Sequence, residues 1–175
     1  MMRNCCVIWV IFCLSIGSGF ASDRSHALVN SFLVMCALEP LDFAKSEGKA
    51  AAMRLPVKQD LHPAPDSSGS VVRSKSWLMP LKTGSHEFSV AEARGPKGEV
   101  KSCGIAAADV VSADLRTDLT KTMKLTSPVS DVAAKDGIHR TTTWLYGGLK
   151  LQLTDRSPRS LPGIYLFLVQ SPLER

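Results

Sequence analysis

The spacing of hydrophobic residues changes along the chain, and near the start it is helical. In residues 25–38, apolar side chains recur three or four positions apart, as on one face of a helix. They are Leu28, Phe32, Met35 and Cys36. Ser25 is the predicted N-cap of this helix, and Pro40 ends the pattern. A second helix is predicted over residues 41–53, before Pro56.

After residue 70, apolar and polar residues alternate, as in strands with one buried face. In residues 87–91, Phe88 and Val90 share one face. Glu87 and Ser89 share the other. Six strands are predicted, at residues 71–79, 87–91, 99–106, 140–146, 149–154 and 164–169. The last of these is apolar on both faces, which is typical of a central strand.

One helix interrupts the strands, at residues 109–125, with Asp109 as its N-cap. Its apolar positions fall four apart, at Val111, Leu115, Leu119 and Met123. Residues 56–70 contain three prolines and indicate a surface loop. The element order predicts an α+β fold in a single domain over residues 22–175. It has two N-terminal helices and a mainly antiparallel sheet of about six strands.

One predicted strand, at residues 99–106, leaves two alternatives open. Cys103 shares a face with Glu99 and Lys101, although a buried face does not normally carry charges. Either the strand contains a bulge, or the charged residues lie beyond the buried part of the sheet.

Residues 1–21 differ in composition from the rest of the chain. They contain one charged side chain, Arg3, followed by an uncharged run at residues 5–16. As a helix this run spans about 18 Å, well short of the ~30 Å core of a bilayer. Small residues up to Ala21 occupy the positions that signal peptidase requires. We therefore predict a signal peptide cleaved between Ala21 and Ser22, with no stable membrane anchor afterwards; an uncleaved signal anchor is the alternative.

Removing the leader leaves two cysteines, Cys36 and Cys103. An exported chain meets an oxidising compartment, where paired cysteines persist as disulfides, so we predict a bond between them. In the chain-entropy model, a bridge across about 67 residues stabilises the fold by about 4 kcal/mol.

Other chemistry at these positions has less support. Cys103 could be a nucleophile with His139 as its base, but no local motif favours this. The histidines, at positions 26, 62, 86 and 139, lack the close ligand spacings of a structural zinc site. We therefore predict no catalytic residue, no metal and no cofactor.

Sequence motifs exclude few classes of function. No nucleotide-binding, phosphate-loop, serine-hydrolase or metalloprotease signature occurs, which weakens an enzyme interpretation without excluding it. The turn at residues 94–98 is interpreted as a solvated hairpin turn, with anion binding through Arg94 and Lys97 as the alternative. Trp77 and Trp144 are interpreted as core residues.

The charge of the chain does not indicate nucleic-acid binding. Beyond the leader, 20 basic and 16 acidic side chains are scattered along the sequence and form no basic stripe. The weak positive charge favours attraction to an anionic envelope surface or to an acidic protein over nucleic-acid binding.

Taken together, these features resemble small exported proteins of proteobacteria that have no assigned biochemical role. The resemblance rests on the leader, on an early helix ending near Cys36, on Gly98 five residues before Cys103, and on later tryptophan- and leucine-rich strands. It implies a periplasmic location and a Cys36–Cys103 bond, and it implies nothing about chemistry.

We expect a periplasmic or secreted, non-catalytic domain that acts by binding an envelope protein or a small ligand. A small secreted hydrolase is one alternative. The other is an inhibitor of an exogenous enzyme, with residues 56–70 or 156–162 as the loops that would enter the target.

Overall fold

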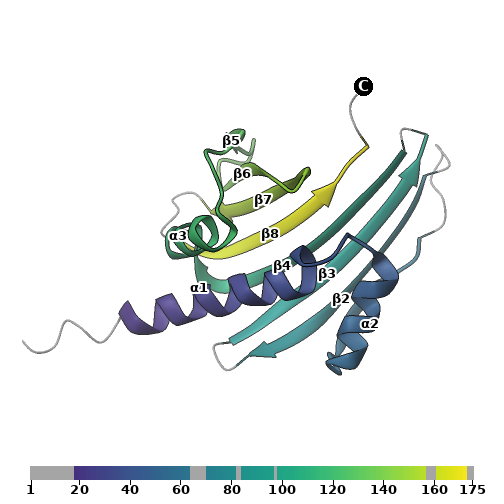
Figure 1. Cartoon of the computed structure of the whole chain (residues 1–175), viewed down its shortest axis with the longest axis horizontal. Helices are drawn as coiled ribbons and strands as arrows, with labels where there is room; N and C mark the ends of the chain where they lie inside the picture. The colour runs from purple at the N-terminus through teal and green to yellow at the C-terminus, as the bar shows by residue number, and fades with distance from the viewer. Residues whose placement is uncertain (1–17, 64–69, 82–83, 97, 157–160, 173–175) are drawn as a thin grey trace, which may run out of the picture.

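The computed structural model of the protein is a curved, eight-stranded antiparallel sheet with helices packed against one side (Figure 1). The structure describes residues 18–63, 70–81, 84–96, 98–156 and 161–172. The helices are α1 (Ser18–Phe32), which continues into the π-helical segment η1 (Leu33–Ala37), α2 (Phe43–Ala52) and α3 (Ser112–Met123). The strands are β1 (Val57–Leu61), β2 (Val71–Leu81), β3 (Gly84–Gly95), β4 (Gly98–Val111), β5 (Ser130–Ala133), β6 (His139–Tyr146), β7 (Leu149–Arg156) and β8 (Pro162–Gln170).

The sheet consists of two four-stranded meanders, and its strand order is β1-β2-β3-β4-β8-β7-β6-β5. The first meander is β1 to β4, α3 follows it, and the second meander is β5 to β8. Because β8 pairs with β4 on one side and β7 on the other, it lies in the middle of the sheet. The prediction of a central strand at residues 164–169 is therefore confirmed.

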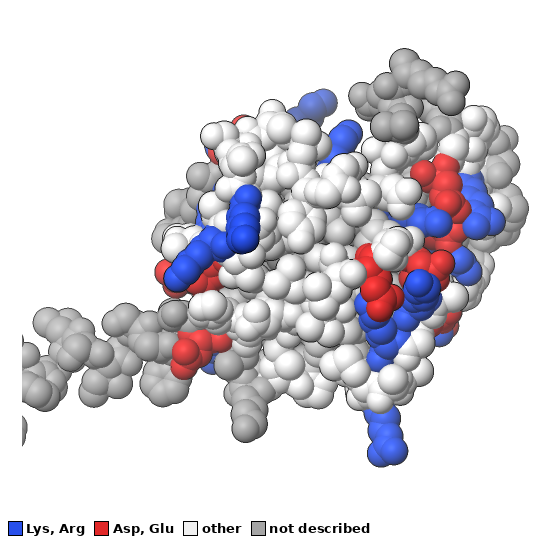
Figure 2. All heavy atoms as spheres, in the orientation of Figure 1, with Lys and Arg blue, Asp and Glu red and all other residues white. Residues whose placement is uncertain are grey.

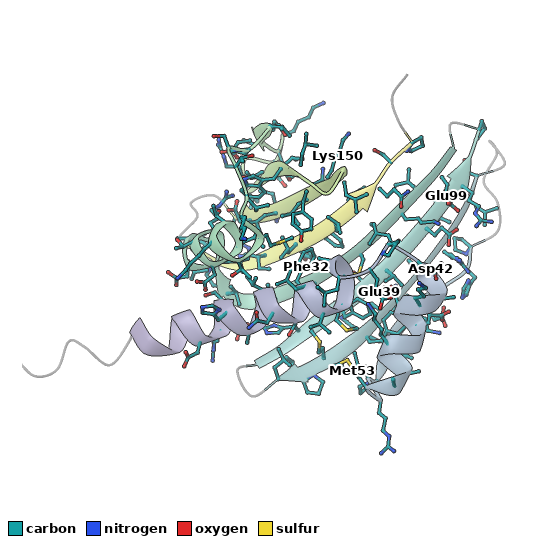
Figure 3. All side chains as sticks on the ribbon, in the orientation of Figure 1. Phe32, Glu39, Asp42, Met53, Glu99 and Lys150 are labelled. Carbon is teal, nitrogen blue, oxygen red and sulfur yellow. A yellow bond between two sulfur atoms is a disulfide. The ribbon has the colours of Figure 1, made fainter. Side chains whose placement is uncertain are left out.

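The hydrophobic core lies between the helices and one face of the sheet. The predicted apolar face of the first helix is buried at all four positions, and Figure 3 labels Phe32 where α1 ends against the sheet. Alternate strand residues meet these helices from the other side. They include Phe88, Val90, Ile105, Leu151, Leu153, Leu166 and Leu168. Helical and strand periodicities thus meet in one core, as expected for a layered domain.

The predicted α+β class and antiparallel sheet are confirmed, but the strand count of six is wrong. β1 lies within residues 56–70, which were predicted to be a loop, and β5 was not predicted. Both are short edge strands, and all of their residues are exposed. A strand without a buried face has no hydrophobic alternation, so its sequence pattern is that of a loop.

Two predicted helix caps are also wrong. Ser25 lies inside α1, where it is buried and its hydroxyl donates a hydrogen bond to the Asp118 carboxylate. Asp109 lies in β4, because this strand continues to Val111 and α3 begins only at Ser112. At both sites a side chain that could cap a helix instead bonds to another element.

The two alternatives for residues 99–106 are resolved by the register of the sheet. β4 pairs with β3 without interruption from Gly98 to Ala106, so the strand has no bulge there. Glu99 and Lys101 instead lie beyond the apolar part of the face, next to charged residues of β3.

The N-terminal prediction is only partly within the described residues. Residues 1–17 of the predicted leader lie outside them. The predicted cleavage point, between Ala21 and Ser22, falls within α1.

Candidate functional site

The helices cover one face of the sheet, which we call the inner face. Cys36 of η1 is bonded to Cys103 on this face. Phe43 of α2 lies below the Arg73 guanidinium of β2, 4.1 Å from the ring centre to the guanidinium carbon. Leu119 of α3 is buried in the same core. None of these described helices packs on the opposite face, which we call the open face.

The disulfide decides between the interpretations of Cys103. Cys36 and Cys103 are bonded, as predicted from the count of cysteines beyond the leader, and their Cα atoms lie 5.5 Å apart. A bonded sulfur has no thiolate to act as a nucleophile. The alternative with His139 as base is therefore wrong in this structure. The His139 ring lies at the start of β6, 2.7 Å from the Asp136 carboxylate.

His139 and Asp136 form a turn and not a catalytic pair. Asp136 also accepts hydrogen bonds from the backbone amides of Ile138, at 2.8 Å, and His139, at 3.0 Å. The hydrogen bond from the His139 side chain and these two amides lower the pKa of Asp136 to about 2. The carboxylate thus holds the β5–β6 connection together.

The central part of the open face consists of three rows of side chains that cross the sheet from β1 or β2 to β5 or β6. The register of neighbouring strands places each member beside the next. The Tyr165 row contains Leu78, Glu87, Ala106, Tyr165, Thr154, Thr141 and Val132. The Phe167 row contains Gln59, Ser76, Ser89, Gly104, Phe167, Gln152, Thr143 and Ser130. The Val169 row contains Leu61, Ser74, Ala91, Ser102, Val169, Lys150 and Leu145.

These three rows carry little formal charge. Only Glu87 and Lys150 are charged in the three rows, and the Phe167 row has no charged member. Partial burial opposes the ionisation of Glu87, but the Lys58 ammonium, 2.5 Å away, keeps its pKa below the usual value. Exposed apolar side chains, serine, threonine and glutamine make up most of the remainder. Such a surface favours contact with an uncharged partner.

Two aromatic rings of β8 lie at the centre of the open face. A Cβ at Gly104 would fall 2.1 Å from a ring carbon of Phe167, so the Phe167 ring lies across this glycine. The Tyr165 ring is nearly parallel to it, with an interplanar angle of 8° and 6.5 Å between ring centres. Tyr165 is 50% exposed and is paired with the small Ala106. The two rings form a platform on the strands below them.

Charged residues gather on the inner face instead, around α2 (Figure 2). Glu92, whose side chain is only 4% exposed, pairs with Arg73 and Arg94. Arg94 also lies 2.7 Å from Glu99, and Lys101 lies 3.0 Å from the same carboxylate. Each of these groups therefore has a partner of opposite charge within the protein. Figure 3 labels Glu99 near the start of β4.

The same cluster argues against anion binding by the turn at residues 94–98. Arg94, its basic residue within the described part of the chain, is already paired with two carboxylates. Lys97 lies outside the described residues. A shallow hollow beside this cluster, between α2 and β3–β4, has Val90 and Cys103 in its lining and offers little space for a ligand.

A buried ion pair links α3 to the second meander. Arg116 donates hydrogen bonds to Asp155 at 2.8 Å and to Thr142 at 2.7 Å. Thr142 in turn donates to Asp131 of β5 at 3.0 Å. The Asp155 side chain is fully buried, and a buried charge is tolerated only when paired in this way. This network fixes α3 on the sheet.

The remaining candidates for chemistry also have structural roles. Trp77 and Trp144 are buried, and Trp77 stacks on Phe88 with 5.2 Å between ring centres, as expected for core residues. Within the described ranges, no group of three or more His, Cys, Asp or Glu side chains could hold a metal ion. Nor is any helix in these ranges long and apolar enough to cross a membrane.

Comparison with protein-family models, with curated proteins and with solved structures found no match to this chain. The function must therefore be inferred from the chemistry of its surfaces.

Sequence reasoning missed the open face because its rows combine residues from all eight strands. One local signal was present. Gly104 interrupts a strand pattern, and a glycine in a strand often marks the close approach of another group. Here that group is the Phe167 ring, 63 positions later in the chain.

Proposed function

We propose that this protein is an exported, non-catalytic binding protein of the cell envelope, and that it binds its partner through the open face. The observation that carries the proposal is a face of the sheet that no described helix covers and that is almost free of charge. The leader predicted from the sequence and the Cys36–Cys103 disulfide support an envelope location.

The contrast with the inner face supports this choice of surface. On the inner face, exposed charges compensate one another in ion pairs, and the large apolar residues of the central strands are already buried. The open face has unburied apolar residues, such as Leu145 with 62% exposure and Val132 with 61%. A partner that covers them removes apolar surface from water, at about 25 cal/mol per Å².

A charge placed in the Phe167 row tests the proposal. The immobilised protein and its Ser89→Arg variant are incubated with an isolated envelope fraction, and the retained components are compared. Ser89 is half-buried beside Gly104, so an arginine there introduces an unpaired charge at the centre of the face. Thr117→Arg, on the exposed side of α3, is the matched control.

We expect the native protein and Thr117→Arg to retain the same component, and Ser89→Arg to lose it at least tenfold. Circular dichroism and thermal unfolding of both variants establish that they are folded. The proposal is wrong if the native protein retains nothing, or if folded Ser89→Arg retains as much as Thr117→Arg.

A further inference from the structure

The platform of Tyr165 and Phe167 has a more specific use, which rests on the proposed function of the open face. We propose that the open face binds a neutral, extended polysaccharide, with sugar rings stacked on these two aromatic rings. Four features support this proposal: the two neighbouring aromatic rings, the polar groups beside them, the scarcity of charge and the length of the surface.

The two rings lie side by side and Tyr165 is half exposed. The Phe167 ring extends over Gly104 of the neighbouring strand. The planes of the Tyr165 and Phe167 rings are parallel to within 8°. The faces of aromatic rings carry partial negative charge, which attracts the polarised C–H groups on the apolar face of a sugar ring. Two neighbouring, nearly parallel rings can therefore contact one sugar chain.

The groups beside the rings are those that hydrogen-bond sugar hydroxyls. Gln152 is paired directly with Phe167, and Thr154 with Tyr165. Ser89 lies beyond Gly104 on the other side of the platform. Hydroxyl and amide side chains both donate and accept, as sugar hydroxyls do. The platform is thus flanked by uncharged hydrogen-bonding groups on both sides.

The scarcity of charge in these rows favours a neutral glycan over other partners. The Phe167 row contains no charged residue, and Glu87 of the neighbouring row is paired with Lys58. A surface that binds anionic lipid or an acidic polymer needs unpaired basic groups, because attraction to the opposite charge supplies much of the affinity. Lys150, in the Val169 row, is one basic residue in three rows.

The shape of the surface favours an extended chain over a small molecule. The Phe167 row crosses all eight strands, which are spaced about 4.8 Å apart, so it is about 34 Å long. Small ligands are usually enclosed in deep pockets. The hollow beside Cys103 lies on the inner face, between α2 and β3–β4, and not on the open face.

Affinity electrophoresis in gels that contain polysaccharide tests this proposal. The probes are four neutral polymers, hydroxyethylcellulose, xyloglucan, starch and dextran, together with the anionic polymer carboxymethylcellulose. Hydroxyethylcellulose and carboxymethylcellulose share a backbone and differ in charge. We expect at least one neutral polymer to retard the protein. We also expect carboxymethylcellulose to retard it less than hydroxyethylcellulose if a cellulose backbone is recognised.

Variants of the platform separate stacking from other contacts. Tyr165→Ala removes an exposed ring and should weaken binding about tenfold, the scale of one lost aromatic contact. Tyr165→Phe keeps the ring and should bind like the native protein. Leu38→Ala removes exposed apolar area on the helical side, outside the open face, and should also leave binding unchanged.

The proposal is wrong if none of the neutral polymers retards the native protein, or if Tyr165→Ala is retarded as strongly as Tyr165→Phe. Its failure is distinguishable from failure of the proposed function. If no glycan binds but Ser89→Arg still loses an envelope component, the open face binds a partner of another kind. If Ser89→Arg loses nothing, the open face is not the binding surface.

Discussion

The two faces of the sheet are built from the same strands and differ in what their alternate residues contribute. In β3, for example, Val90 and Glu92 face the helices, whereas Ser89 and Ala91 face outwards. A half-covered sheet normally places its charges on the wet face. In β2 to β4 most of the charges lie instead on the helical side. The central rows of the open face therefore carry few charges, although the chain has many charged residues available for them.

The inner face is stabilised by interactions that the open face lacks, and the disulfide is expected to be the largest of them. Replacing both cysteines, as Cys36→Ser with Cys103→Ser, should lower the free energy of unfolding by about 4 kcal/mol, because the bond closes a loop with a sequence separation of 67. Urea unfolding of both proteins measures this loss. A change below about 1 kcal/mol would show that the bond does not hold η1 on the sheet.

Matched leucine substitutions compare the two faces directly. Leu166→Ala, in the buried core under the helices, should cost about 3 kcal/mol, through lost burial and the cavity that remains. Leu78→Ala, on the open face, should change the stability by less than about 0.5 kcal/mol. Equal losses in urea unfolding would mean that the open face is covered in solution.

Parts of this comparison could be predicted from the sequence. The helical spacing of Leu28 and Phe32 and the alternation around Phe88 identified the inner face, because burial against one layer leaves a local pattern. The pairing of Cys36 with Cys103 followed from their being the two cysteines beyond the leader.

The open face and the edge strands could not be predicted in this way. The pairing of β8 with β4 joins residues about 60 positions apart, and no local periodicity encodes it. The strand β1 has no buried residue, so its sequence resembles a loop. Asp109 and Ser25 have the chemistry of helix caps, but tertiary contacts with Arg24 and Asp118 place them elsewhere.

A substitution at Gly104 should show that the open face also has a fixed structure. In Gly104→Ala the new Cβ would lie 2.1 Å from a ring carbon of Phe167 and 2.7 Å from the Leu166 carbonyl oxygen. We expect a loss of about 2 kcal/mol from this overpacking. Thermal unfolding measures the loss, and Gly48→Ala, in an open position on α2, is the control that should not destabilise. A Gly104→Ala protein as stable as the native one would mean that Phe167 does not lie over the glycine.

Acid should lower the stability by a smaller amount, through His86 at the edge of the inner face. His86 is 1% exposed, and neither ring nitrogen has a hydrogen-bond partner among the described residues. Burial lowers its pKa; attraction to Asp109 opposes this shift, and repulsion by Arg24 adds to it. The unfolded chain therefore takes up a proton near pH 6.5, before the folded protein does.

Stability should accordingly fall as the pH drops below about 6.5, by no more than about 1.4 kcal/mol per pH unit for this one group. Urea unfolding at pH 7.5 and pH 5.5 measures the fall. His86→Leu should lose less stability than the native protein over this interval, and His62→Gln, at an exposed position, should lose as much. Identical losses in the native protein and His86→Leu would show that His86 does not cause the acid sensitivity.

Hydroxyl-radical footprinting of the protein, free and bound to its envelope component or glycan, tests the central claim most directly. In the free protein, Tyr165 and Leu145 of the open face and Leu38 on the helical side, at 70% exposure, should all be oxidised. If the partner binds the open face, it should protect Tyr165 and Leu145 from oxidation and leave the oxidation of Leu38 unchanged. Protection of Leu38 with continued oxidation of Tyr165 would contradict it.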